Sequence, residues 1–458
     1  MGFVIIHPND NIKVSLEDGH KYAVKAVKRG ENVIKYGFPI GIASADIEVD
    51  EHVHSHNLKT ALSGIEEYTY SPMLSDISDE EPITISAFVR KNGDIGIRND
   101  IWIVNTVGCV NKVAETLSRR TGALSFPHPY GCSQLGDDNL CTQQILCGLI
   151  KHPNAGGVLV LGLGCENNNI TELKKVLGAY DEERVRFLNV QDCEDEIAEG
   201  IRIIEELKMK AQNDVRTKVS ISKLKIGLKC GGSDGLSGIT ANPLVGKISD
   251  RLISMGGIAV LTEVPEMFGA EQVLMNRCAD RETFEKAVTL INDYKRYFIS
   301  HNQPVSENPS PGNKEGGITT LEEKSLGCVQ KGGKSTVTAV LDYGDTATEK
   351  GLNLLNGPGN DIVAITNLTA VGCHLILFTT GRGTPLGAPV PTIKISTNTK
   401  LSNQKPHWID FDAQKVLVDK NTADELFDLI VNTVNGEETK NEKSGYREIA
   451  IFKDGVTL

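Results

Sequence analysis

The sequence lacks the features that mark nucleic-acid-binding, secreted or membrane proteins. Its 458 residues carry a formal net charge of −12 and no basic cluster, which argues against nucleic acid as a partner. Aromatic residues make up only 5%, and no apolar run approaches the roughly 18 residues of a membrane-spanning helix. The opening MGFVIIHP has no basic region and no cleavage site. We therefore expect a cytoplasmic chain without a membrane partner.

Cysteine is present, but not in metal-binding spacing. None of the 10 cysteines forms a C-x-x-C pair, which excludes a zinc ribbon and a ferredoxin-type run. In an unexported chain the thiols should stay reduced, and core burial is their ordinary role. Because they are scattered among several loops, we expect no compact all-cysteine site. Five nevertheless lie beside glycine in or next to loops that follow predicted strands: Cys109, Cys132, Cys165, Cys230 and Cys373.

The standard cofactor and nucleophile motifs are also missing. No G-x-G-x-x-G opens a helix after the first strand, and no G-x-S-x-G is present, which argues against NAD and against a serine hydrolase elbow. The GGKST at residues 332–336 resembles the end of a nucleotide-binding loop, but the first glycine of that motif is replaced by Cys328.

The organisation of the chain predicts an α/β protein. Residues 1–65 contain short, turn-bounded strands and predict a small, mostly-β domain. Residues 66–82 are acidic and polar and predict an exposed linker. Continuous apolar strands then alternate with helices, which is typical of parallel sheets. We expect two such α/β units, at residues 83–220 and 221–458.

The stretch KIGLKCGGSDGLSGITANP, residues 225–243, places a glycine-rich loop directly after a short buried strand. Ligands bind at the carboxyl ends of strands in open α/β sheets, and glycine lets backbone amides approach a ligand. The stretch carries a thiol, a hydroxyl, a carboxylate and an amide. The alternative is a plain glycine-rich turn. The candidate residues are Cys230, Ser233, Asp234 and Asn242.

A histidine cluster follows in EHVHSHN, residues 51–57. If this segment is a strand, alternation places His52, His54 and His56 on one face. Three imidazoles on one face suit a metal ion or acid–base chemistry, whereas the alternative is a surface strand with histidines by chance.

Two arginine-containing loops complete the candidates. Arg98 and Asn99 follow a hairpin predicted at Asn92-Gly93, and they suit either an anion contact or ordinary surface. Arg382 lies between two glycines after an apolar strand, with Thr384 beyond it. A guanidinium beside free backbone amides suits a carboxylate or phosphate, and the alternative is a plain turn.

Several of these motifs together resemble the altronate/galactarate dehydratase family, which also includes sulfolactate sulfo-lyase. The resemblance runs nearly end to end and implies an N-terminal SAF-like domain fused to a large catalytic part. The altronate branch is the most similar. The motifs are EHVHSHN at 51–57, GIRN at 96–99, KCGGSD at 229–234, TTGRGTP at 379–385 and REIAIFKDGVTL at 447–458.

The resemblance implies a hydro-lyase of hexuronate catabolism that converts D-altronate to 2-dehydro-3-deoxy-D-gluconate and water. It also implies a divalent metal, Fe2+ or else Mn2+, and a homodimer. Galactarate or another 2-hydroxy acid is the alternative substrate. The residue types suggest catalytic roles for His54, His56, Glu166, Glu263 and Cys230, metal binding by His52, His54 and His56, and substrate binding by Arg98, Asn99, Ser233, Asp234, Asn242, Arg382 and Thr384.

Two other classes of function remain open at this point. A sugar-acid-binding protein without catalysis would use the same loops without a metal. An enzyme without a metal could use Cys230 as a nucleophile. The three histidines favour the metal enzyme.

Overall fold

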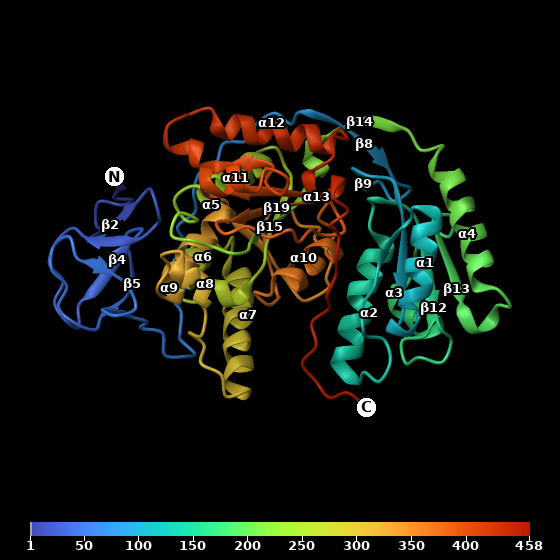
Figure 1. The fold of residues 1–458 in the computed structure, drawn as a ribbon, viewed down its shortest axis with the longest axis horizontal. Coiled ribbons are helices and arrows are strands. Elements are labelled where there is room, and N and C mark those ends of the chain that lie inside the picture. Colours follow the sequence, from blue (N-terminus) through green and yellow to red (C-terminus); the bar gives the residue numbers. More distant parts are fainter. Residues whose placement is uncertain (1) are drawn as a thin grey trace.

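A computed structural model describes residues 2–458. It consists of a small β domain, a central α/β unit and a second α/β unit, which follow one another across the molecule in Figure 1. The central unit is built on a seven-stranded sheet, whose strands lie between residues 225 and 412. The other unit, called the outer unit below, is built on a four-stranded sheet, whose strands lie between residues 100 and 189. The predicted fold class is therefore confirmed, with parallel pairing throughout both large sheets.

The N-terminal domain folds as two small antiparallel sheets that share a core. Alternate residues such as Ile12 and Val14 point inward and are fully buried, as expected for half-buried strands. One sheet has the order β1-β2-β3-β6, with β1 Phe3–Val4, β2 Ile12–Ser15, β3 Lys21–Ala23 and β6 His52–Val53. The other has the order β4-β5-β7, with β4 Asn32–Lys35, β5 Phe38–Ala43 and β7 Leu58–Lys59.

The segment that follows, residues 60–83, contains neither helix nor strand. It touches the central unit through scattered bonds, such as that from the Met73 N–H to the Asn276 carbonyl at 2.6 Å. The hairpin predicted at Asn92-Gly93 is confirmed. It pairs β8 Thr84–Val89 with β9 Ile95–Gly96, and β14 Arg216–Ser220 completes this small antiparallel sheet.

The outer unit has helices on both faces of its parallel sheet. Ile101 and Ile103 of β10 pack toward one helix pair, while Trp102 and Val104 pack toward the other. This alternation explains why β10 is apolar throughout its middle. The strand order is β11-β10-β12-β13, with β10 Asp100–Asn105, β11 Leu124–Phe126, β12 Ala155–Gly162 and β13 Val185–Asn189. The helices are α1 Asn111–Thr121 and α4 Glu196–Ala211 on one side, and α2 Gly136–Lys151 and α3 Ile170–Leu177 on the other.

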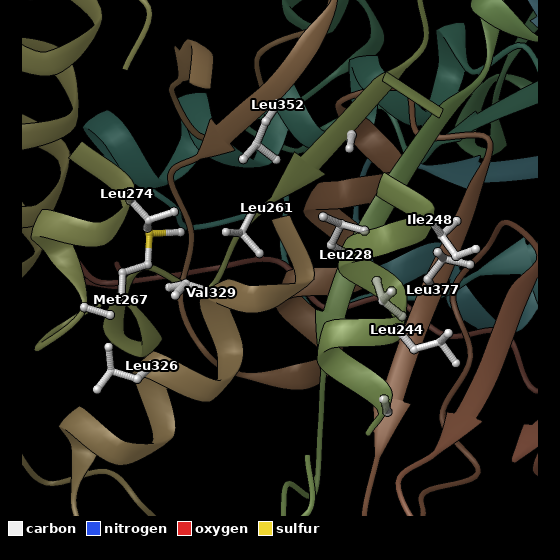
Figure 2. Packing of buried hydrophobic residues seen from close by; sticks show 14 of the residues in the cluster. Leu228, Leu244, Ile248, Leu261, Met267, Leu274, Leu326, Val329, Leu352 and Leu377 are labelled. Carbon is white, nitrogen blue, oxygen red and sulfur yellow. The ribbon is translucent and has the colours of Figure 1, made fainter. Parts of the chain in front are cut away.

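The central unit contains the main hydrophobic core. Figure 2 shows Leu228 and Leu377 of neighbouring strands close to Leu244 and Ile248 of α5, Ala241–Ser254. All seven strands are parallel, in the order β17-β18-β16-β15-β19-β20-β21. Their bounds are β15 Lys225–Cys230, β16 Ile258–Leu261, β17 Val337–Leu341, β18 Gly351–Leu355, β19 Leu375–Thr380, β20 Thr392–Ser396 and β21 Phe411–Asp412.

The remaining helices surround this sheet. They are α6 Glu271–Met275, α7 Arg281–Ser300, α8 Pro311–Glu315, α9 Leu321–Cys328, α10 Asp361–Ala370, α11 Thr399–Gln404, α12 Thr422–Val434 and α13 Lys440–Lys443. Residues 271–300 form two helices, α6 and α7, because Asp280 caps a new helix start by accepting from the Thr283 N–H. Among residues 2–458, no helix combines the length and the apolar character needed to cross a membrane.

Candidate functional site

Three neighbouring strands of the central sheet end at one place. β15 ends at Cys230, Glu263 follows β16, and Thr379 lies at the end of β19. Lys229 contacts the Glu263 carboxylate and lies 2.8 Å from Asp361. Polar and charged groups from separate strands thus gather where α/β sheets hold their ligands.

The charges at this edge are buried and mutually paired. Lys331 lies 3.0 Å from Glu263, and Lys324 lies 2.8 Å from Glu266. Burial raises the pKa of Glu263 to about 7, with a further contribution from the nearby Glu266 carboxylate. Glu263 also adopts a left-handed backbone conformation, with φ of +74°. Strain and a shifted pKa of this kind often accompany functional sites.

Cys230 belongs to the same buried group. Its Sγ lies 2.7 Å from Ser233 Oγ, and the Asn242 amide lies 3.9 Å away. A hydrogen bond from Cys328 and the charge of Lys331 lower the pKa of the Cys230 thiol to about 5, despite its burial. Asn242 is fixed in turn by accepting from Thr379 Oγ1 at 2.6 Å.

The space beside these groups is too small for a sugar acid. The cavity lined by Ser233, Asn242 and Cys328 measures about 10 Å³, which is the room of a single water molecule. Ser233 and Asn242 therefore position the Cys230 loop in this structure, rather than facing a polyol. Cys230 and Glu263 are likewise enclosed, each with 1% of its surface exposed.

An open cleft of about 370 Å³ lies between this edge and the N-terminal domain. Asp18 and His20 form one wall, and Asp234, Arg382 and Asn398 contribute to the other. This cleft, rather than the buried group, has the volume of a small-molecule site.

Glycine allows the two walls to approach each other. A Cβ on Gly235 would lie 2.0 Å from the carbonyl oxygen of Gly19, and Gly19 itself has φ of +77°. Both positions therefore exclude any larger side chain. The predicted glycine-rich loop thus serves domain docking as well as the cleft.

Arg382, which the sequence predicts to bind an anion, lies on the cleft wall. Its side chain is 43% exposed, and one nitrogen lies 2.9 Å from the exposed carboxylate of Glu315. An exposed ion pair of this kind contributes little to stability, so a substrate carboxylate can compete with Glu315 for the guanidinium.

Two other predicted residues of these loops are hydrogen-bonded within the protein. Asp234 accepts from Thr397 at 2.8 Å and from Asn398 at 3.1 Å, and burial raises the pKa of its carboxyl group. Thr384 accepts from the Leu386 N–H within its own turn, and it does not line the cleft.

The three predicted histidines are close together, although not through strand alternation. β6 ends at Val53, and the chain then turns, so the expected single strand face does not form. The His52 ring still stacks with His54 at 5.6 Å and with His56 at 5.7 Å between ring centroids. A fourth imidazole, His20, approaches from the hairpin of β2 and β3, with its Nδ1 3.0 Å from His52 Nε2.

His20 and its neighbour Asp18 were missed by sequence reasoning. Neither lies in a motif of metal-ligand spacing, and His20 is far from His52 along the chain. Only the antiparallel pairing of β3 with β6, which places Tyr22 opposite His52, brings these histidines together. A lone histidine after an Asp-Gly turn gives no recognisable signal.

The histidines fit a divalent metal as a pair, but not as the predicted set of three. Within residues 2–458, no three or more His, Cys, Asp or Glu side chains converge closely enough for one ion. His54 Nε2 instead lies 2.9 Å from the Lys314 carbonyl, to which it can donate. His20 and His52 have nitrogens close enough to bind one ion together, and burial lowers the pKa of His52 to about 4, which favours the neutral, ligating form.

Arg98 and Asn99 have structural contacts, in place of the predicted substrate contacts. Arg98 is buried and forms a two-pronged ion pair with Glu442, at 2.7 and 2.9 Å. Asn99 donates to the Ala211 carbonyl at 2.8 Å. Arg98 joins this part of the outer unit to Glu442 near the C-terminus, because a buried guanidinium needs a carboxylate and carbonyl oxygens as partners. Asn99 bonds within the outer unit, to the last residue of α4.

Glu166 is also outside the cleft. It is buried in the outer unit, where it accepts from the backbone amides of Leu163 at 3.1 Å and Gly164 at 2.6 Å, and from Thr106 at 2.5 Å. A carboxylate that accepts several hydrogen bonds within its own loop fixes that loop, and it is not placed to act on a ligand in the cleft.

Comparison with known proteins accounts for the whole chain. Residues 12–61 match the family model described as "Altronate/galactarate dehydratase SAF domain". Residues 87–212 match "D-galactarate dehydratase/Altronate hydrolase, second domain". Residues 221–457 match "D-galactarate/Altronate dehydratase, C-terminal".

Curated relatives agree with these matches. The chain is 50% identical to altronate dehydratase of Escherichia coli strain K12, over 100% of both chains. It is 51% identical to altronate dehydratase of Bacillus subtilis strain 168, over 100% of this chain and 99% of the relative. Galactarate dehydratase (L-threo-forming) of E. coli strain K12 is 28% identical, over 98% and 96% of the two chains. With its three domains matched in order and relatives aligned over their full length, the chain belongs to the altronate/galactarate dehydratase family of hydro-lyases.

Proposed function

We propose that this protein dehydrates D-altronate to 2-dehydro-3-deoxy-D-gluconate and water. Support comes from the two altronate dehydratases that are about half identical along the whole chain. The structural observation that supports the assignment is the cleft that carries both His20 and Arg382. An imidazole that can hold a metal ion and an exposed guanidinium that can bind a carboxylate suit an elimination next to a carboxylate.

Arg382 binds the substrate carboxylate in this proposal. The C2 proton next to that carboxylate is weakly acidic, and its loss moves negative charge onto the carboxylate oxygens. A guanidinium that donates two parallel N–H bonds becomes a stronger partner as this charge grows. Arg382 therefore both orients the substrate and stabilises the charge that develops during the reaction.

Asp18 is the proposed base for the C2 proton, because its carboxylate lines the cleft beside His20. Asp234 is the proposed acid that protonates the departing C3 hydroxyl, because its carboxyl group lines the cleft and burial raises its pKa. The enol that remains converts to the 2-keto acid, so the atoms balance as one substrate giving one keto acid and one water.

A divalent metal, Fe2+ or else Mn2+, is part of the proposal. His20 and His52 would hold it, and a bound ion would supply electrostatic stabilisation of the enediolate. Its support is the imidazole pair at the cleft and the family to which the chain belongs. A cytoplasmic location and a homodimeric state are proposed on the same grounds of family membership.

An assay across substrates tests the assignment. Purified protein is incubated with D-altronate, other aldonates and galactarate, and keto-acid formation is followed in each. We expect the highest kcat/KM with D-altronate. Galactarate is the alternative, favoured by the 28% identical relative, and a higher kcat/KM with galactarate would overturn the assignment. Absence of keto acid from every sugar acid would support a binding protein without catalysis.

A further inference from the structure

Exposed cysteines are confined to one edge of the outer unit. Of the 10 cysteines, Cys109, Cys132 and Cys165 are exposed, whereas the other seven are buried or half-buried. Free cysteine is among the most buried residue types, and an exposed thiol is liable to oxidation. Packing in the core therefore does not explain why these three cysteines occur in neighbouring loops.

The sheet topology brings the three thiols to the same edge. Cys109, Cys132 and Cys165 follow β10, β11 and β12, which are adjacent and parallel. The carboxyl ends of parallel strands share one edge, where ligand sites form. The sequence reasoning treated these thiols as scattered, because they are far apart along the chain.

Hydrogen bonds lock the three loops to one another. The Gly108 N–H donates to the Tyr130 carbonyl at 2.9 Å, which joins the first two loops. The Asn168 N–H donates to the Gly131 carbonyl at 2.9 Å, and this bond joins the second loop to the third. Each cysteine thus lies in a loop that is hydrogen-bonded to the loop of another of the three cysteines.

Glycine at these loops permits the close approach. A Cβ on Gly131, which has φ of +99°, would lie 1.9 Å from the Thr106 carbonyl oxygen. A Cβ on Gly108 would lie 2.8 Å from the His128 carbonyl oxygen. The glycine that precedes each of Cys109 and Cys132 therefore serves to bring the thiol-bearing loops together.

The surroundings suit thiolates. Helices α1, α2 and α3 begin shortly after Cys109, Cys132 and Cys165, and the positive ends of helices favour negatively charged sulfur. The Gln191 amide also lies 3.6 Å from Cys165 Sγ, as a donor to sulfur.

Buried polar groups next to these loops lack partners within the described residues. Asn105 Oδ1, Asn168 Oδ1 and Gln134 Nε2 have no hydrogen bond, although all three residues are at most 3% exposed. Unsatisfied buried groups are rare in folded proteins. The Gln134 N–H can donate to a sulfur atom, whereas the two asparagine oxygens are acceptors that need a donor such as water.

We infer that Cys109, Cys132 and Cys165 together hold an iron–sulfur cluster. Thiolates select iron–sulfur clusters and other soft metals over Mg2+ or Ca2+. With three protein thiolates, a cluster of four irons retains one iron without a cysteine ligand.

This site is separate from the cleft. The thiols belong to the outer unit at one end of the molecule, whereas His20 and His52 belong to the N-terminal domain at the other end, as Figure 1 shows for these two parts. Substituting the cysteines or the histidines therefore distinguishes iron bound by the thiols from iron bound by His20 and His52.

Purification of the full chain without oxygen tests the inference. Iron, zinc and acid-labile sulfide are measured, together with the visible absorption and electron paramagnetic resonance spectra. We expect about four sulfide per chain with about four iron, or with about five iron if Fe2+ also occupies the His20–His52 pair. Each of Cys109→Ser, Cys132→Ser and Cys165→Ser should lose most of the sulfide and the visible absorption.

Two control variants make the result specific. Cys193→Ser removes a half-buried thiol that follows the neighbouring strand β13. Because this thiol donates to the Asn189 carbonyl, the Cys193→Ser variant should retain the cluster. His52→Ala should also retain the sulfide. Circular dichroism checks that each variant is folded. Iron without sulfide, zinc in place of iron, or full sulfide in the three cysteine variants would each overturn the inference.

Discussion

Lys21 of β3 and Glu323 of α9 form an ion pair of 2.8 Å in which both side chains are completely buried. Lys35 binds the other carboxylate oxygen at the same distance. One carboxylate of the central unit therefore pairs with two lysines of the N-terminal domain. This contact fixes the domain that supplies His20 to the cleft.

Removing the charge of Glu323 should destabilise the protein strongly. Glu323→Gln leaves Lys21 and Lys35 buried without a carboxylate, and breaking a buried pair in this way costs about 3–5 kcal/mol. The free energy of unfolding measured for the first transition in urea should fall by this amount. Glu199→Gln, which breaks an exposed pair with Arg202, should change it by less than about 1 kcal/mol. Equal stability of the two variants would contradict the role of Glu323.

The same carboxylate should make the protein sensitive to acid. Burial acts to raise the pKa of Glu323, but Lys21 and Lys35 outweigh it and lower the pKa to about 2, from 4.5. A lowered carboxyl pKa stabilises the folded state above pH 4.5, and this stabilisation is lost as the pH falls from 4.5 towards 2. The contribution is about 3 kcal/mol, since one pKa unit corresponds to about 1.4 kcal/mol. Urea unfolding across this range should show a shallower pH dependence in Glu323→Gln than in the natural protein.

Substitution of Arg382 should impair catalysis without unfolding the protein. Lysine cannot reproduce the two parallel N–H bonds of a guanidinium, so Arg382→Lys should lower kcat as well as raise KM for the sugar acid. A charge-assisted bond contributes about 1.5–3 kcal/mol, which corresponds to a loss of about tenfold to over a hundredfold in kcat/KM. The thermal unfolding midpoint should stay within about 2 °C, because the side chain is exposed.

The matched control is Arg202→Lys, which changes an arginine on the exposed face of α4 and should retain the natural kcat/KM. If Arg382→Lys behaved like Arg202→Lys, the carboxylate would be bound elsewhere in the cleft, where Lys400 is the next basic residue.

The histidine pair should control divalent metal binding. His20→Ala and His52→Ala should each weaken Fe2+ or Mn2+ binding about tenfold or more, since each removes a direct ligand, and activity should fall with metal content. The variant chains are titrated with each metal by calorimetry. His301→Ala, which removes an exposed histidine paired with Asp454, should bind metal as the natural protein does. Unchanged metal affinity in His20→Ala would exclude His20 as a ligand.

Limited proteolysis should first cut the segment at residues 66–82. It has no regular structure, and most of its residues from 71 onward are exposed. Brief digestion should release a large fragment that begins near Ile83, identified by mass spectrometry. A first cut within residues 225–262, which are almost entirely buried, would contradict this domain organisation.

Much of the fold follows directly from the sequence. Apolar runs such as β12 and β19 are buried on both faces of a parallel sheet, so they have an unmistakable local pattern. The glycine-rich loop after β15 and the exposed Arg382 were likewise predictable, because strand ends and glycine-flanked arginines are recognised from a few consecutive residues. Family membership came from similarly local motifs.

The composition of the sites, however, depended on tertiary contacts. Arg98 and Arg382 look alike in sequence, yet one is neutralised by Glu442 from a distant helix and the other faces the cleft. His20 and the three exposed cysteines had no local signal, because their partners come from loops far away along the chain. The sequence by itself determined the strands, helices and loops, since these depend on neighbouring residues. Only the packing of separate strands decided which polar side chains meet, since that depends on long-range pairing.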